Sequence, residues 1–177
     1  MKTYVALLRG INVGGHNKIP MADLRELLSK AGLHNVKTYI QSGNVIFHSN
    51  EKEKELEEKI RKSIETHFGF EVSVLVKSSN ALLKIFNSCP YENEKKEKSY
   101  FIVLNRIPEN ELVEEVKHIT YENEEFMIIK DCLYFYSDLD FGQTKFNMNT
   151  FERKLKVKGT SRNFNTMVKL LSLCAEI

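Results

Sequence analysis

The chain has 177 residues, of which 42% are hydrophobic and 28% are charged, so it has room for one large domain or two small ones. Its formal net charge of +2 by itself predicts no polyanionic partner. No stretch approaches the roughly 20 apolar residues that span a bilayer, and the N-terminus shows no signal-peptide pattern. We therefore expect a cytoplasmic protein without a membrane segment.

The first part of the chain predicts a βαββαβ series. Strands are expected at residues 3–8, 36–40, 45–48 and 72–76, and helices at residues 20–31 and 51–68. The first helix begins at Pro20, a residue that suits the first turn because its missing N–H is not needed there. In the second helix, the spacing of Glu57 and Arg61 predicts an ion pair on the outer face.

The second part repeats this order of elements. Strands are expected at residues 100–104, 126–129, 133–136 and 157–160, and helices at residues 108–119 and 145–155. A short helix at 81–87 links the two parts, and another at 165–173 closes the chain. The charged segment 91–98 is expected to be an exposed loop.

The order of elements predicts an α+β fold of two tandem ferredoxin-like α/β plaits with antiparallel sheets. The first plait, which carries a glycine-rich loop, is placed at residues 1–78. The second plait, with the linker helix and the C-terminal helix, is placed at residues 79–177. The residues themselves show no repeat, so the duplication rests on the order of elements alone.

The loop from Arg9 to Lys18 is the most informative motif, because it lies between the first strand and the first helix. It is rich in glycine, with Gly10, Gly14 and Gly15. Such a loop lets backbone N–H groups turn toward an anion. Arg9 and Lys18 add positive charge, and Asn12 adds a neutral donor. The loop therefore predicts an anion site.

The same loop satisfies neither common nucleotide-binding pattern. The spacing of Gly10 and Gly15 fits G-x-x-x-x-G-K-[ST], but His16 and Asn17 stand where lysine and a hydroxyl residue belong. The dinucleotide pattern G-x-G-x-x-G requires glycine at Asn12. The alternative is a crossover loop that needs glycine only for its backbone angles.

The segment Gln41-Ser42-Gly43-Asn44 predicts a turn between two strands, since Gly43 and Asn44 tolerate positive φ. Gln41, Ser42 and Asn44 are also candidate ligand contacts. Ser42 lacks the G-x-S-x-G elbow, and no histidine with an acidic partner is identifiable as its base. The turn is therefore favoured over catalysis.

A second polar cluster lies near the C-terminus. Its candidate binding residues are Arg162, Asn163, Asn165 and Lys169. Arginine holds a phosphate or carboxylate through two parallel hydrogen bonds. The alternative, compatible with binding, is that Thr160, Ser161 or Asn163 caps the last helix.

Charge is distributed unevenly along the sequence. Residues 1–50 carry six basic and two acidic groups, giving +4, and residues 141–177 carry seven and two, giving +5. Residues 109–125 carry one basic and seven acidic groups, giving −6. If the basic ends meet, they form a positive surface that favours anionic ligands. The alternative is that the charges solvate separate faces.

The cysteines and histidines predict no metal site. Cys89, Cys132 and Cys174 are odd in number and far apart, which fits neither a disulfide framework nor a zinc site. The five histidines show no metal-ligand spacing. We expect buried free thiols and name no cofactor.

Several motifs together resemble the bacterial family called domain of unknown function 1697. They are residues 7–15 (LLRGINVGG), 20–25 (PMADLR), 39–47 (YIQSGNVIF) and 160–166 (TSRNFNT). The resemblance implies two tandem ferredoxin-like plaits and no assigned activity. Phe164 departs from it, because the family usually has tryptophan there and phenylalanine lacks the indole N–H.

We expect an anionic small molecule, bearing a phosphate or carboxylate, to bind at the junction of the two plaits. The expected contacts are Arg9, Gly10, Asn12, Gly14, Gly15, Lys18, Gln41, Ser42, Asn44, Arg162, Asn163, Asn165 and Lys169. Since no nucleophile or base is identified, catalysis stays open. The alternatives are an RNA-binding module, which lacks its aromatic signature, and an interaction scaffold that uses Phe151, Phe164 and the C-terminal helix.

Overall fold

The computed structural model describes the backbone of residues 1–177 and the side chains of these residues except at position 141. The chain divides into two units, one formed by Met1–Leu83 with Lys169–Ile177 and the other by Lys84–Val168. Two helices, α3 (Ser79–Asn87) and α7 (Phe164–Ala175), contribute residues to both units. The units divide after Leu83, within α3, whereas the sequence placed the boundary between residues 78 and 79.

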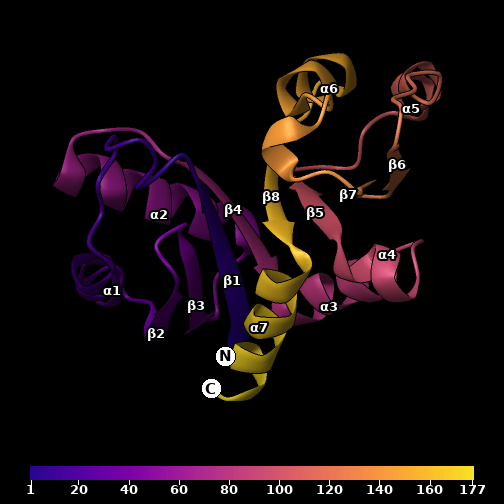
Figure 1. The fold of residues 1–177 in the computed structure, drawn as a ribbon. Helices are drawn as coiled ribbons and strands as arrows, with labels where there is room; N and C mark the ends of the chain where they lie inside the picture. Colours follow the sequence, from indigo (N-terminus) through magenta and orange to yellow (C-terminus); the bar gives the residue numbers. More distant parts are fainter. The chain divides into compact units, whose positions relative to one another are not determined.

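The first unit contains a βαββαβ plait (Figure 1). Its elements are β1 (Lys2–Arg9), α1 (Met21–Lys30), β2 (His34–Tyr39), β3 (Asn44–Ser49), α2 (Glu53–Phe68) and β4 (Ser73–Ser78). The sheet has the order β2-β3-β1-β4, and neighbouring strands are antiparallel. β1 and β3 are therefore the central strands and β2 and β4 are the edge strands, as in a split βαβ arrangement.

The second unit has the same arrangement. Its elements are β5 (Ser99–Leu104), α5 (Asn110–Val116), β6 (Glu124–Ile129), β7 (Cys132–Ser137), α6 (Met148–Leu155) and β8 (Gly159–Asn163). A short helix, α4 (Asn93–Glu97), precedes them, and a 3₁₀ turn, η1 (Phe141–Gln143), lies between β7 and α6. The sheet order is β6-β7-β5-β8, again antiparallel throughout. The predicted α+β fold of two plaits is confirmed.

Alternating residues of the strands build the core of the first unit against α1 and α2. The helices contribute an apolar stripe, consisting of Leu24, Leu28, Leu56, Ile60 and Ile64. These side chains pack on every second residue of β1, namely Tyr4, Ala6 and Leu8. The stripe has the spacing of one helix face, which is why the sequence pattern identified both helices.

The corresponding core of the second unit is largely aromatic. Phe146 stacks on Phe135 with ring centroids 4.4 Å apart and on Phe151 at 4.8 Å. Phe126 meets Phe151 edge-to-face at 4.8 Å. Only 2% of Phe151 is exposed, so the expectation that it forms a contact surface is wrong. Its ring is more stable inside this cluster than in water.

Aromatic side chains also cover the opposite face of this second sheet. Phe86 of α3 stacks on Phe101 of β5 at 5.6 Å and contacts Phe164 of α7 at 5.5 Å. Tyr134 of β7 lies beside Phe101, and its hydroxyl donates a 2.6 Å hydrogen bond to the carbonyl of Ile85. Phe101 and Tyr134 are at most 1% exposed. The central strands are therefore buried on both faces.

The segment 91–98 was expected to be an exposed loop, and here the structure differs. Residues 93–97 form α4, and Tyr91 is only 8% exposed. Its ring packs on Tyr136 with ring centroids 6.0 Å apart, and the Lys95 ammonium lies over the Tyr136 ring, 5.1 Å from its centre. The charged residues led to the prediction of an exposed loop, although Tyr91 anchors the segment in aromatic packing. Long charged side chains can cover such apolar surface while their ends stay in water.

Some helix boundaries also differ from expectation. The helix predicted at 108–119 spans only Asn110–Val116, and the helix predicted at 145–155 begins at Met148. Asn147 caps this helix, because its side chain accepts a hydrogen bond from the Thr150 N–H. The cap decides the first residue, which periodicity alone cannot do.

Two buried tyrosines of the second unit provide a paired test of this packing. The hydroxyl of Tyr91 is buried and has no hydrogen-bond partner among the described residues, whereas that of Tyr134 donates to Ile85. Burial raises the pKa of both phenols, so both are protonated at neutral pH. We expect Tyr91→Phe to leave the free energy of unfolding unchanged or raise it by about 1 kcal/mol, and Tyr134→Phe to lower it by about 1–2 kcal/mol. Urea unfolding of both variants measures this, and equal losses would show that Tyr91 is satisfied in solution.

Candidate functional site

The connection from β1 to α1 contains a small hairpin. Val13 and His16 form an antiparallel bridge, and the His16 N–H donates to the Val13 carbonyl at 3.0 Å. Gly14 and Gly15, between them, have φ values of 58° and 78°. Two central residues with positive φ are what a tight two-residue hairpin requires. The glycine pair therefore forms an exposed turn, unlike the phosphate loops whose patterns it nearly matches.

Asn12 holds the base of this hairpin. Its side-chain amide donates to the carbonyls of Ile19 at 3.1 Å and Gln41 at 2.8 Å. Its side-chain oxygen accepts a 2.8 Å hydrogen bond from the Ile19 N–H. Both amide hydrogens are thus used within the protein. Asn12 is best described as a positioning residue, although the sequence suggested it as a ligand donor.

Apolar anchors and a second asparagine complete the hairpin base. Ile11 and Ile19 are each only 1% exposed, so both ends of the hairpin are fixed in the core. Asn17 has a φ of 49° and donates from its side chain to the Gly10 carbonyl at 3.0 Å. Its own carbonyl accepts the Asn12 N–H at 3.1 Å. The loop is therefore ordered by specific contacts before any ligand arrives.

The turn between β2 and β3, residues 40–43, lies directly against the loop. The Leu8 N–H donates to the Gly43 carbonyl at 2.8 Å. A Cβ on Gly43 would lie 2.6 Å from the Leu8 Cβ and 2.9 Å from the Ile11 Cδ1, and its φ is 86°. Asn44 is fully buried and donates from its amide to the Tyr39 carbonyl and to the Ser42 hydroxyl. Two loops far apart in sequence thus form one surface, which we call the loop surface.

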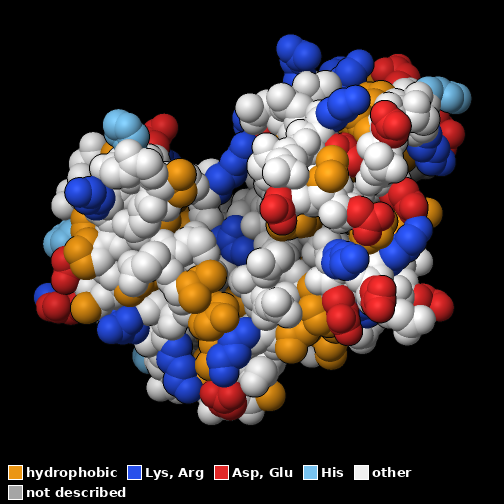
Figure 2. Space-filling view, viewed as in Figure 1, with side chains coloured by type: hydrophobic (Ala, Val, Ile, Leu, Met, Phe, Trp, Pro, Cys, Tyr) orange, Lys and Arg blue, Asp and Glu red, His pale blue; other side chains and the backbone are white. Residues whose placement is uncertain are grey.

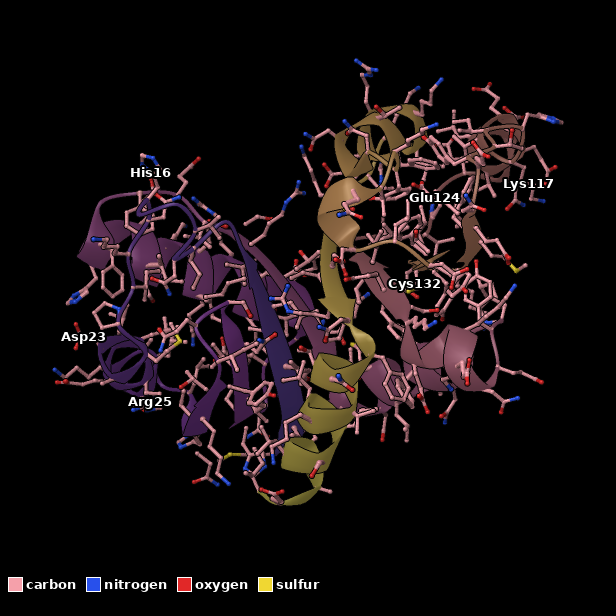
Figure 3. All side chains as sticks on the ribbon, viewed as in Figure 1. His16, Asp23, Arg25, Lys117, Glu124 and Cys132 are labelled. Carbon is pink, nitrogen blue, oxygen red and sulfur yellow. The ribbon has the colours of Figure 1, made fainter. Side chains whose placement is uncertain are left out.

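The exposed polar groups of the loop surface are donors and cations, and the apolar side chains of Val13 and Ile40 are exposed beside them. The side chains of His16, Lys18 and Gln41 are exposed and have no partner among the described residues. Arg9 is half-buried at the end of β1, and Ser42 is exposed. Segments 9–20 and 40–44 contain no acidic residue. Figure 3 shows His16 projecting outward from these loops.

The N-terminus of α1 follows the loop surface directly. The helix begins at Met21, one residue after the expected start, and Pro20 occupies the cap position without a side-chain hydrogen bond. The Leu24 N–H donates to the Pro20 carbonyl at 3.0 Å, as the first intrahelical bond. The preceding amides of the first turn add a partial positive charge beside Lys18. Asp23 in that turn is a competing negative charge.

The second cluster predicted from the sequence lies at β8 and α7. Arg162 is 8% exposed, and burial lowers the pKa of its guanidinium to about 10. It donates to the Ser161 carbonyl at 2.8 Å. The Asn163 side chain accepts the Thr166 N–H at 2.9 Å, so its expected capping role is confirmed. Asn165 is exposed on α7.

These candidate residues fall into different units of the chain. Arg9 to Lys18 and the turn at 40–43 belong to the first unit, whereas Arg162, Asn163 and Asn165 belong to the second. Lys169 is exposed and is counted with the first. Within the described residues, no group of three or more His, Cys, Asp or Glu side chains is placed to hold a metal ion. The cysteines are free, and burial raises the pKa of the Cys174 thiol to about 11, which makes it a weak nucleophile at neutral pH.

The structure contains a groove that no sequence pattern predicted. A groove of about 560 Å³ runs along β6 in the second unit, lined by Tyr91, residues 119–121 and residues 124–128. Figure 3 places Glu124 and Lys117, which also contribute to it, beside β6 and α5. Glu124 is buried, and its carboxylate accepts hydrogen bonds from the N–H groups of Lys145 at 2.6 Å and Phe146 at 3.0 Å.

Comparison with known proteins places the chain in a family. Residues 1–134 match the family model described as protein of unknown function DUF1697. The chain belongs to the DUF1697 family. The structure of the conserved bacterial protein SP0830 from Streptococcus pneumoniae is similar over 99% of both chains, with 25% sequence identity and a TM-score of 0.78. None of the curated proteins compared with the sequence matches it.

The DUF1697 match contains the whole loop surface, whereas Arg162 and the residues after it lie outside the matched range. In the described part of this DUF1697 protein, none of the helices is long and apolar enough to cross a membrane.

Gly43 tests how tightly the two loops pack in this DUF1697 protein. We expect Gly43→Ala to lower the free energy of unfolding by roughly 2–4 kcal/mol, because the new Cβ meets Leu8 and Ile11 and the positive φ is strained. Gly32→Ala is the matched control, since its φ is also positive but no atom lies within 4 Å of its Cβ. Urea unfolding measures both. Equal losses would mean that backbone strain alone acts at Gly43.

Asn12 tests the order of the hairpin. Asn12→Gly tolerates the φ of 54° but removes the acceptor of the Ile19 N–H. We expect the Ile19 amide to exchange its hydrogen roughly fivefold faster, since a lost hydrogen bond costs about 1 kcal/mol. Asn17→Gly removes a different contact and is expected to change that rate little. Hydrogen exchange followed by NMR gives the rates, and similar acceleration in both variants would contradict a specific role for Asn12.

Proposed function

We propose that this DUF1697 protein binds a small anionic molecule, bearing a phosphate or a carboxylate, at the loop surface. The observation that carries the proposal is the composition of this surface after its internal bonds are counted. Asn12 joins the two loops through the Gln41 carbonyl, and Asn44 closes the turn between β2 and β3. The polar groups that face outward are donors and cations without an acidic side chain, beside the exposed apolar side chains of Val13 and Ile40. A surface of this kind attracts anions.

The two loops are already ordered without a ligand, which favours the affinity of such a site. A ligand that binds a preformed surface does not have to pay the entropy of ordering two loops. Lys18 is a point charge for a phosphate or carboxylate, and Gln41 and Ser42 are neutral hydrogen-bonding groups beside it. The first-turn amides of α1 add their dipole to the same region. Together these groups suit the recognition of one or two anionic oxygens.

The proposal concerns binding rather than a reaction. The hydroxyl of Ser42 accepts a hydrogen bond from Asn44 at 3.1 Å, and no base has been identified for it. A cytoplasmic location belongs to the proposal, because the three free cysteines suit a reducing compartment.

An RNA-binding role receives less support. Modules of this topology stack bases on aromatic side chains of an open sheet face. In the second unit the aromatic residues Phe101 and Tyr134 of the central strands are at most 1% exposed. In the first unit, Val5 and Leu7 of β1 and Ile46 of β3 are fully buried. These residues leave no aromatic platform on the central strands.

The test is a thermal-shift screen with inorganic phosphate, pyrophosphate, nucleoside monophosphates, citrate and a short RNA. A ligand that binds only the folded state, at about 100 times its Kd, adds about 2.7 kcal/mol to stability. Lys18→Ala removes an exposed cation whose side chain makes no hydrogen bond or ion pair with the described residues, so we expect unchanged stability without ligand and about tenfold weaker binding. The matched control is Lys2→Ala, which removes the same charge from the other end of β1.

The proposal is wrong if no anion shifts the melting temperature, or if Lys18→Ala and Lys2→Ala weaken binding equally. Arg162→Lys, measured with the same ligand, decides separately whether the second polar cluster takes part. An RNA shift that survives Lys18→Ala would favour the RNA-binding alternative.

A further inference from the structure

The edge strand β6 differs from the other sheet edges of the protein. It pairs with β7 on one side only, and its other side opens into the groove described above. Five consecutive residues of the strand, 124–128, line this groove. Tyr91 borders it on the side of Tyr136, and Ile119 and Tyr121 border it on the side of the aromatic core.

The strand registers show which main-chain groups of β6 point into the groove. The Leu104 N–H donates to the Asp131 carbonyl at 2.8 Å, so alternate residues from 131 onward on β7 bond to β5 and the residues between them bond to β6. Tyr134, one of the latter, is opposite Met127. The N–H and C=O groups of Phe126 and Ile128 therefore point away from the sheet.

The edge of β4 is closed by two glutamates of α2, and the first outward position of β8 is capped by a glutamate of α6. On β4, the outward N–H of Val76 donates to Glu57 at 3.1 Å and that of Ser78 donates to Glu53 at 2.8 Å. On β8, the N–H of Gly159 donates to Glu152 at 2.8 Å. Such contacts block pairing with another strand.

The remaining edge, β2, is irregular. Its register with β3 shifts between His34 and Lys37, and Lys37 is exposed on the strand. A bulge and an edge lysine both discourage strand addition.

No comparable protection exists on β6. Among the described residues, no side chain caps the outward N–H of Phe126 or Ile128. A turn occupies only the first position, where Tyr121 bridges to Glu124. Met127 is 47% exposed although it lies in the middle of the strand. This edge is open to a further strand.

The charge around β6 indicates what kind of strand fits. Residues 109–125, from the start of α5 to the start of β6, carry seven acidic groups and one basic group. Figure 2 shows acidic side chains over α5 and around β6 on the face drawn. Pairing with β6 of a second copy would bring two such acidic segments together, which costs energy. A basic segment would be attracted electrostatically to this acidic region, whereas a second copy would be repelled by it.

We propose that the edge of β6 binds an extended, lysine- or arginine-bearing segment of another protein by strand addition. The main-chain groups of Phe126 and Ile128 would pair with those of the segment. Its side chains would alternate between the Tyr91 side and the Ile119 side of the groove, because successive residues of a strand point to opposite faces. The acidic segment supplies attraction and selects against acidic partners.

The test uses a short fluorescein-labelled peptide in which lysine and valine alternate, with binding followed by fluorescence anisotropy. The matched peptide carries N-methyl groups on all of its backbone nitrogens, so neither of its edges can donate main-chain hydrogen bonds. A second control peptide replaces lysine by glutamate. We expect the first peptide to bind and both controls to bind at least tenfold more weakly.

Protein variants test the same edge from the other side. Ile128→Pro removes the outward N–H and leaves the hydrogen bonds to β7 in place. Ile128→Val is the matched control, because it also shortens the side chain but keeps that N–H. We expect at least tenfold weaker binding for the proline variant only. Since the proline variant could be unstable, Glu122→Lys changes the charge of an exposed residue beside the strand, and we expect about threefold weaker binding.

The results that overturn the proposal are specific. If the N-methylated peptide binds as well as its parent, the interaction is electrostatic attraction without strand addition. If the protein sediments as a dimer that Ile128→Pro dissociates, a second copy occupies the edge instead. If no peptide binds, the edge is merely open.

Discussion

The antiparallel pairing of β1 with β3 is the constraint from which the candidate site follows. Leu7 lies opposite Asn44, so the loop that leaves β1 and the turn that enters β3 must leave the sheet at the same end. Gly43 then has no space for a side chain, because Leu8 and Ile11 occupy that volume. The loop surface is therefore a product of strand register, which brings Gln41 and Ser42 beside the local loop that carries Arg9 and Lys18.

Backbone hydrogen bonding also explains how the two plaits differ in use. Each four-stranded sheet has two edges, and every outward N–H or C=O needs water or a partner. In the first unit, α2 supplies Glu53 and Glu57 to β4, so the helix closes an edge while it packs on the core. In the second unit, Glu124 is used to fix residues 145 and 146, and β6 stays open. The same fold thus presents a loop surface in one unit and a strand edge in the other.

Local patterns predicted the elements well and their partners less well. Glu57 has the spacing to pair with Arg61, yet it accepts the N–H of Val76, and Arg61 pairs with Glu58 and Glu65 instead. Asn12 was identified as a donor for a ligand, yet its amide holds the hairpin to Ile19 and Gln41. In both cases one competing partner, Val76 or Gln41, comes from a distant part of the chain, which spacing within one helix or loop cannot reveal.

The sequence by itself determined the order of elements, the two plaits and the family, because helix and strand periodicity and the glycine-rich motif are local properties. It also identified the basic residues of the loop surface, the half-buried Arg9 and the exposed Lys18, since they flank the glycines. Only the tertiary structure decided that Asn12 and Gly43 serve packing, that Tyr91 is an aromatic anchor and that β6 keeps a free edge. These features depend on which segments meet across the sheet, and that information resides in strand register and burial rather than in neighbouring residues.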